Sequence, residues 1–224
     1  MFKKILIICA HPDDELIGCG GLILNNLKKT KFKIIYTCKT YDKRNKKVKN
    51  KYALRKRKAI KLSQQLNIET PIFFNFPGLS LQRKDITSMS QLLLNEIKIF
   101  KPDSIFTHFI EDLHHDHRAT SESVMIATRP SSYNASVKNL FYFEIPSATE
   151  KLKKKNRVFN PNFFIDITDN INLKVNLIKK YYSQELKKYP SALSIEGIIN
   201  LSKYRGNNIR RKNVEAFEAI KLIM

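Results

Sequence analysis

Hydrophobic and polar positions follow one another along the chain in blocks of two kinds. Continuous apolar runs such as KKILIICA (3–10) are typical of parallel strands that are covered on both faces. Longer segments between them carry apolar residues at helical spacing. The predicted strands are 3–10, 31–40, 71–77, 103–109, 139–146 and 162–168, and the predicted helices are 18–29, 52–67, 88–100 and 120–129. From about residue 170 we expect mostly helical, basic structure.

This alternation predicts the fold class. We expect an α/β, Rossmann-like three-layer fold in a single domain, 1–224, since no repeat or low-complexity linker divides the chain. The sheet should be mostly parallel, with strand order 3-2-1-4-5, right-handed crossovers and helices on both faces. Ligands of such sheets bind beyond the carboxyl ends of the strands, where the strand order reverses.

The composition indicates the cellular environment of the protein. No apolar run approaches the length of a membrane span. The N-terminal run is short, ends in acidic residues and lacks a small-residue cleavage site, so we expect a strand rather than a signal peptide. Three cysteines form an odd, sparse set, which argues against a disulfide framework and favours the reducing cytoplasm.

The net charge of +21 has three interpretations. Sixteen Lys or Arg residues against one acid, Asp42, lie between Lys28 and Lys61. This segment could bind nucleic acid or an anionic surface, it could attract an anionic substrate, or it could be a set of solvated lysines without a partner. Solvated lysines are favoured, because aromatic residues suited to base stacking are sparse in the segment.

Two polar clusters follow predicted strands. ICAHPDDELIGCGG places His11, Asp13 and Asp14 just after the first strand, and EDLHHDHRAT places His114, Asp116 and His117 after the fourth. Each cluster alone has a structural explanation, as a capped helix start or as a polar loop. The first and fourth strands are neighbours across the reversal of strand order, so both clusters should face one crevice. Imidazole and carboxylate without paired cysteines suit a catalytic zinc, and an aspartate not bound to the metal can act as general base.

The sequence also resembles a known family. AHPDDE with the distal D-x-H-x-D-H is similar to the PIG-L/LmbE-like family of zinc-dependent N-deacetylases, and the similarity covers nearly the whole chain. KPDSIFTHFIEDLHHDH closely resembles the family's second block, whereas the helix around Arg55 departs from it, with Arg57 and Lys58 in place of acids. FFIDIT and YRG…VEAF most resemble members that act in bacterial surface-polysaccharide synthesis.

The resemblance implies a role for each matching residue. His11, Asp14 and His117 would bind Zn²⁺, with Fe²⁺ as the alternative metal. Asp13 would be the general base, His114 would stabilise the oxyanion or protonate the leaving amine, and Asp116 would orient His114. Arg55 would contact the substrate.

Neighbouring residues carry smaller expectations. Glu15 and Asp112 could support the site by hydrogen bonds or take part directly, and His115 should be solvated. His108 should be packed or hydrogen-bonded at its strand end without a metal.

The function implied by the resemblance is removal of an N-acetyl group from an amino sugar or its conjugate, giving acetate and a free amine. The substrate would be a small, possibly anionic molecule. The alternative is a basic protein that binds nucleic acid or an anionic surface on an inactive deacetylase scaffold. The acyl group, the sugar and the oligomeric state are not readable from the sequence.

Overall fold

The computed structural model describes residues 2–39, 46–130, 136–149 and 157–223, with side chains from residue 51 in the second of these ranges. The described strands are β1 (Lys4–Cys9), β2 (Lys31–Lys39), β3 (Ile72–Pro77), β4 (Ser104–His108), β5 (Asn139–Phe143), β6 (Phe163–Asp166) and β7 (Val214–Lys221). The described helices are α1 (Asp14–Asn26), α2 (Lys46–Gln65), α3 (Arg83–Phe100), α4 (His115–Ala127), α5 (Ile171–Tyr182) and α6 (Ile195–Asn207).

One sheet joins all the described strands in the order β3-β2-β1-β4-β5-β7-β6. The predicted order 3-2-1-4-5 is confirmed, and these five strands pair in parallel. The expectation of mostly helical structure after residue 170 is wrong for β7, which lies antiparallel between β5 and β6. Its apolar Val214, Phe217 and Ile220 have a spacing near that of a helix. Pairing of Phe217 with Phe143 and with Phe163 decides the extended conformation instead.

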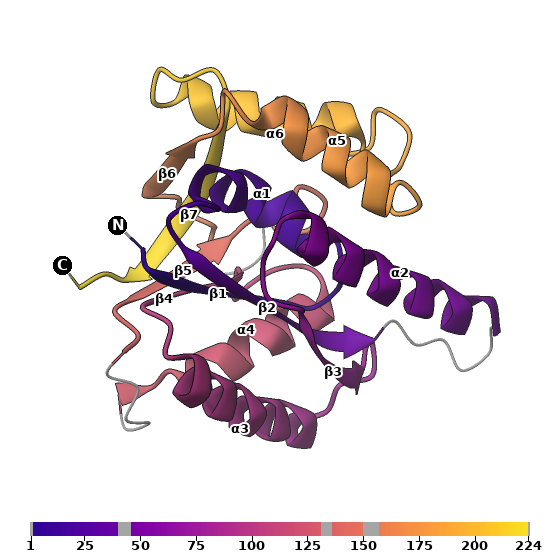
Figure 1. Cartoon of the computed structure of the whole chain (residues 1–224), viewed down its shortest axis with the longest axis vertical. Coiled ribbons are helices and arrows are strands. Elements are labelled where there is room, and N and C mark those ends of the chain that lie inside the picture. The colour runs from indigo at the N-terminus through magenta and orange to yellow at the C-terminus, as the bar shows by residue number, and fades with distance from the viewer. Residues whose placement is uncertain (1, 40–45, 131–135, 150–156, 224) are drawn as a thin grey trace.

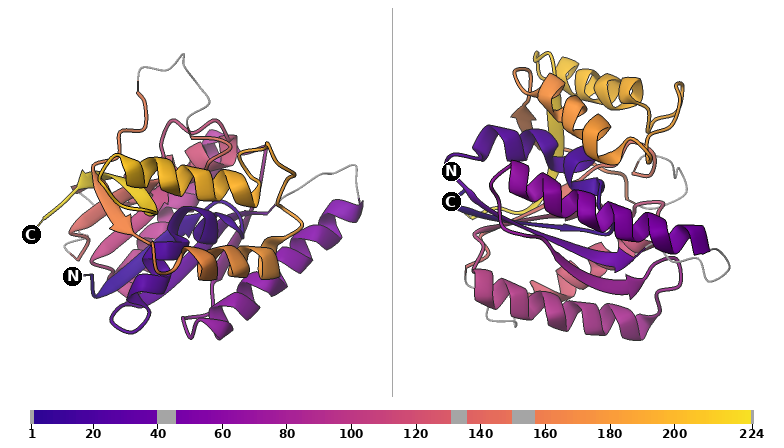
Figure 2. Two further views of the ribbon diagram at one scale, coloured as in Figure 1. Left: turned by 90° about the horizontal axis from the view of Figure 1, so that it is seen from above. Right: turned by 45° about the vertical axis from the view of Figure 1, so that its right-hand side comes forward.

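Helices cover both faces of the sheet, which gives the predicted three layers (Figure 1). In the right-hand view of Figure 2, α1, α2, α5 and α6 lie on one side and α3 and α4 on the other. Side chains of β1 alternate between the two cores: Ile5 and Ile7 pack toward α1 and α5, and Leu6 and Ile8 toward α3 and α4. Both faces are therefore buried, as the continuous apolar run predicts.

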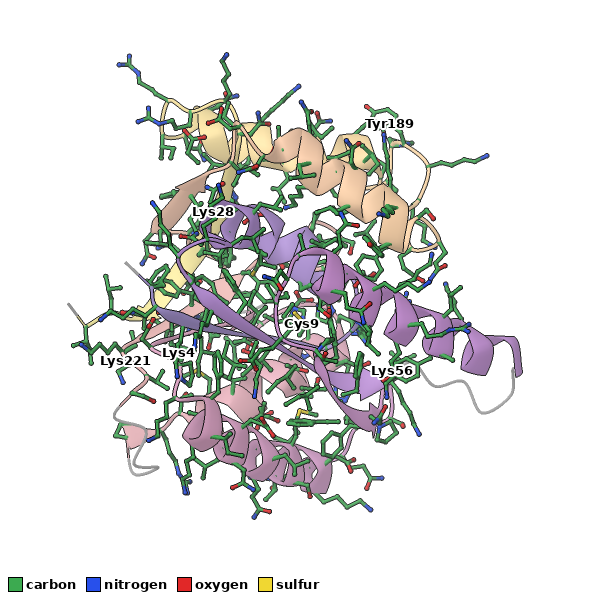
Figure 3. The ribbon with its side chains drawn as sticks, in the orientation of Figure 1. Lys4, Cys9, Lys28, Lys56, Tyr189 and Lys221 are labelled. Carbon is green, nitrogen blue, oxygen red and sulfur yellow. The ribbon has the colours of Figure 1, made fainter. Side chains whose placement is uncertain are left out.

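The cysteines and the lengths of the helices agree with the composition. Cys9, Cys19 and Cys38 are free, buried thiols, and Figure 3 shows Cys9 in the interior of the molecule. Within the described ranges, no helix combines the length and apolarity needed to cross a bilayer.

Helices α1, α3 and α4 begin about four or five residues earlier than the apolar pattern predicts. Polar residues form their first turns: Asp14 and Glu15 open α1, and the His114 side chain caps α4 by accepting a hydrogen bond from the Asp116 amide. The two candidate clusters therefore lie just before and within the first turns of α1 and α4, at the carboxyl edge of the sheet.

The glycines of α1 permit close packing of this helix. A Cβ on Gly18 would lie 2.4 Å from the Phe143 ring, and one on Gly21 would lie 2.1 Å from Ile167 Cγ2. Buried Glu215 of β7 accepts hydrogen bonds from the Gly21 and Leu22 amides at 2.6 and 2.8 Å. Helix α1 is thus held tightly against the C-terminal part of the fold.

We predict that Gly21→Ala destabilises the protein by about 1–3 kcal/mol, because an added methyl group overpacks this interface. Gly20→Ala is the matched control, since its Cβ would approach the Lys174 side chain no closer than 3.0 Å, against 2.1 Å to Ile167 for Gly21→Ala. The stability of both variants is measured as the free energy of unfolding in urea. Equal stability of the two variants would contradict the packing explanation.

Candidate active site

The two polar clusters meet in one cavity at the carboxyl edge of the sheet. Parallel pairing of β1 with β4 sets the strand ends that precede them side by side. The cavity has a volume of about 240 Å³. Its lining includes all seven residues predicted for the site: His11, Asp13, Asp14, Arg55, His114, Asp116 and His117. Residues 100 positions apart in the chain are therefore brought together as the strand order predicts.

Asp14 lies at the centre of the cluster. Its Oδ2 is 3.7 Å from His11 Nδ1, and its Oδ1 is 3.6 Å from His117 Nε2. The Asp14 carboxylate also accepts a hydrogen bond from the His11 amide at 2.8 Å, which fixes the turn. Asp14, His11 and His117 are all buried, and one ligand atom from each lies within 4.8 Å of the others. Ligand atoms about 2.0–2.2 Å from a tetrahedral zinc lie roughly 3.3–3.6 Å from one another, so the three residues need to move little to share an ion.

Each of these two imidazoles has a carboxylate behind it. His11 Nε2 is 2.9 Å from Asp116 Oδ2, and His117 Nδ1 is 3.3 Å from Asp112 Oδ1. The second contact is an ion-pair distance without good hydrogen-bond alignment. Metal-binding histidines commonly direct their second nitrogen at a carboxylate, which orients the ring and strengthens the ligand. Two imidazoles, one carboxylate and this supporting shell fit a catalytic divalent metal site.

Two further groups of three residues overlap the first, namely His11, His114 and Asp116, and His108, Asp112 and His117. In both, an imidazole nitrogen already accepts a hydrogen bond from the backbone, whereas in the first group the backbone hydrogen bond goes to Asp14 Oδ2 and leaves Asp14 Oδ1 facing His117 Nε2. His114 Nδ1 accepts a hydrogen bond from the Asp116 amide, and His108 Nε2 accepts one from the Ala10 amide. The His11, Asp14 and His117 group is therefore the best candidate for the metal.

The charges in the cluster act on one another. Burial raises the pKa of Asp14, but the facing His117 and His108 outweigh burial and lower that pKa below its usual value. Burial likewise opposes the protonation of His117, whereas Asp14 and Asp112 raise its pKa. Burial and the adjacent Asp14 charge raise the pKa of Asp13, and Arg55 opposes them. Asp13 and Asp14, neighbours in sequence, thus have opposite pKa shifts, which suits a base beside a ligand.

His114 is held as a neutral donor. Burial, followed by the charges of His117 and His11, lowers the pKa of His114 to about 4. Its Nδ1 accepts a hydrogen bond from the Asp116 amide at 3.2 Å, so a neutral ring carries its proton on Nε2. A cavity-lining imidazole of this kind can donate a hydrogen bond to a substrate oxygen.

Asp116 contacts His114 through its backbone amide, whereas its carboxylate contacts other groups. Oδ2 is paired with His11, and Oδ1 accepts a hydrogen bond from the Leu79 amide at 2.7 Å. Gly78 permits that approach, since a Cβ there would lie 2.6 Å from Asp116 Oδ2. The segment after β3 is thereby tied to the cluster.

Arg55 lines the cavity but is paired with an acid. Its Nε donates a hydrogen bond to Glu185 Oε1 at 2.6 Å, and its Nη2 also contacts Glu185. Lys51 lies 3.3 Å from the same carboxylate, and Lys187 lines the cavity beside it. Glu185 and Lys187 were not among the predicted site residues, because they lie in a segment with no motif of its own.

Structural roles appear for the remaining residues of the two clusters. Asp112 is fully buried and accepts hydrogen bonds from the His114 amide and the Thr149 hydroxyl. His115 is exposed, as predicted. His108 is buried and hydrogen-bonded at its strand end, and it stacks on His117 with ring centroids 3.8 Å apart.

The sequence matches a family model described as "PIG-L: GlcNAc-PI de-N-acetylase" over residues 6–128, more than half of the chain. The chain belongs to this family. The matched region runs from within β1 to the end of α4 and includes every predicted site residue. The PIG-L resemblance seen in the sequence is therefore confirmed.

A curated PIG-L relative is the probable N-acetyl-α-D-glucosaminyl L-malate deacetylase 2 of Bacillus subtilis (strain 168). It is 27% identical over 136 residues, which span 57% of this chain and 61% of the relative.

Solved structures share the fold. N,N'-diacetylchitobiose deacetylase from Pyrococcus horikoshii superposes with a TM-score of 0.72 at 21% identity, covering 98% of this chain and 84% of its own. The 4-carboxy-2-hydroxymuconate hydratase GalB from Pseudomonas putida KT2440 gives a TM-score of 0.74 at 18% identity, covering 99% of this chain and 98% of its own. The same fold thus occurs in a deacetylase and in a hydratase, so the reaction must be argued from the site.

Proposed function

We propose that this protein is a metal-dependent hydrolase that removes an N-acetyl group from an amino sugar or a conjugate of one. The observation that carries the proposal is the grouping of His11, Asp14 and His117 with Asp13 and His114 on the wall of a single cavity. PIG-L membership supports the same reaction. So does the amino-sugar amide named for the Bacillus subtilis relative.

His11, Asp14 and His117 would hold the metal, which we propose to be zinc, with ferrous iron as the alternative. When bound at such a site, a divalent cation acts as a Lewis acid and lowers the pKa of water to about 7. Asp116 and Asp112 would keep the two imidazoles in the required orientation through their second ring nitrogens.

The remaining residues would move the protons. Asp13 would take a proton from the attacking water and later deliver it to the departing nitrogen as the C–N bond breaks. His114 would donate its Nε2 proton in a hydrogen bond to the carbonyl oxygen as negative charge develops there, an effect worth roughly 3–4 kcal/mol for one donor. Asp116 would fix the tautomer of His114 through its amide. The products would be acetate and a free amine.

Asp13→Asn tests this assignment. We predict that kcat for amine release falls at least about 100-fold, since the general base is lost. The variant should keep about one bound metal per chain, because Asp13 is not a ligand. Substrates to try are N-acetylglucosaminyl malate, N,N'-diacetylchitobiose and other N-acetylated amino sugars.

The adjacent Asp14→Asn is the matched comparison, and it should lose the metal as well as the activity. Full turnover by Asp13→Asn, or loss of its metal, would contradict the proposed base. An absence of amine release from every N-acetylated sugar, together with hydration of an unsaturated acid, would favour chemistry like that named for GalB instead.

We further propose that the substrate is anionic. Residues 51–65 of α2 carry six cations, Lys51, Arg55, Lys56, Arg57, Lys58 and Lys61, and no acid. This helix supplies Arg55 to the cavity wall, so its positive field acts beside the site. We also propose that the enzyme acts in the cytoplasmic synthesis of a bacterial surface polysaccharide or glycoconjugate. This part of the proposal rests only on the resemblance of the C-terminal segments to family members with that role.

The double variant Arg57→Glu/Lys61→Glu should raise KM for N-acetylglucosaminyl malate about tenfold at low salt and leave kcat unchanged. KM for uncharged N,N'-diacetylchitobiose should stay the same. Lys84→Glu/Lys98→Glu on α3 changes the net charge equally on the opposite face of the sheet and is the control. A similar KM increase in both double variants would show that only net charge matters.

A further inference from the structure

Asp13 has a strained backbone. Its φ of 135° and ψ of −32° are unusual for a residue with a side chain. Such a conformation costs roughly 1–3 kcal/mol and persists only where the surroundings hold it in place. The strain occurs at the residue whose carboxylate lines the cavity beside Asp14 and Arg55. Whatever holds the Asp13 backbone therefore also sets where its carboxylate points.

A buried chain of two hydrogen bonds holds this peptide. Glu15 Oε2 accepts a hydrogen bond from the Asp13 amide at 2.9 Å. Glu15 Oε1 accepts a hydrogen bond from the Tyr182 hydroxyl at 2.6 Å. The Glu15 and Tyr182 side chains are both fully buried, with a relative exposure of 0%. Tyr182 is the last residue of α5, 167 positions further along the chain.

Burial of Glu15 needs an explanation. No cation pairs with its carboxylate among the described residues, and burying such a group without a compensating charge is costly. Burial raises the pKa of Glu15 to about 7, although the hydrogen bond from Tyr182 opposes the shift. Glu15 is absent from the cavity lining. It contacts the site through the hydrogen bond from the Asp13 amide, and the Tyr36 hydroxyl also stabilises its charged form.

We propose that Glu15 and Tyr182 are positioning residues that hold the strained Asp13 peptide and so aim its carboxylate into the cavity. The inference rests on the proposed function only in that Asp13 acts as the base. Tyr182 lies outside residues 6–128, so helix α5 contributes to a site whose proposed metal-binding and catalytic residues all come from the family-matched region.

Tyr182→Phe removes the hydroxyl and keeps the buried ring. We expect hydrogen exchange at the Asp13 amide to become about tenfold faster, because Glu15 loses the short hydrogen bond from the Tyr182 hydroxyl. We expect kcat to fall about tenfold, with KM and the metal content unchanged. Tyr181→Phe is the matched control: its hydroxyl donates an equally short 2.6 Å hydrogen bond from the same helix, but to Gln65. Tyr181→Phe should change neither the rate of hydrogen exchange at the Asp13 amide nor kcat.

Glu15→Gln adds a rescue test. Its amide oxygen can still accept from the Asp13 amide and its NH₂ group can donate to Tyr182, so it should retain more of kcat than Glu15→Ala. Unchanged exchange at Asp13 in Tyr182→Phe would overturn the proposal. If the wild-type enzyme is active and Tyr182→Phe shows faster exchange at the Asp13 amide with no fall in kcat, the proposal is also overturned. If the wild-type protein releases no amine, the proposed function fails, and the exchange measurement still decides whether Tyr182 holds the Asp13 peptide.

Discussion

Parallel pairing of β1 with β4 is the constraint on which the site depends. Ile5 to Ile8 pair with Ser104 to Thr107, so the chain leaves both strands at the same edge of the sheet. The strand order reverses here, since β2 continues from β1 in one direction and β4 in the other. His108 links the two exits by accepting a hydrogen bond from the Ala10 amide. This pairing is what brings His11 and His117 close together in space.

The polar groups brought together in this way are largely buried, and their arrangement compensates for that burial. Asp14 faces His11, His108 and His117, while Asp116 and Asp112 lie behind two of these rings. Isolated buried charges are costly, but opposite charges at these distances stabilise one another. The buried Glu15 carboxylate is instead compensated by hydrogen bonds from the Asp13 amide and the Tyr182 hydroxyl. The cluster is therefore fixed before any ligand arrives, as catalysis by positioned groups requires.

Much of the fold and the site could be predicted, because those features are encoded locally. Continuous apolar runs mark β1 to β5, and the two polar clusters directly follow β1 and β4. Features that depend on distant partners could not be predicted in this way. Strand β7 has apolar spacing near that of a helix and is extended because Phe217 pairs with Phe143 and Phe163. Tyr182 and Glu185 carry no local signal, and their importance appears only when α5 and the segment after it reach Glu15 and Arg55.

X-ray absorption at the zinc edge, measured on zinc-loaded wild type and on Asp14→Asn, tests most directly whether one ion is shared by His11, Asp14 and His117, since only this group of the three contains Asp14. The wild-type spectrum should be lost in Asp14→Asn. The expected spectrum shows two imidazole nitrogens at about 2.0–2.1 Å and a carboxylate oxygen at about 2.0–2.2 Å, with no sulfur. Sulfur scattering at about 2.3 Å would place the ion on a cysteine instead. That result, or a spectrum without imidazole, would contradict the proposed metal site and the hydrolase function built on it.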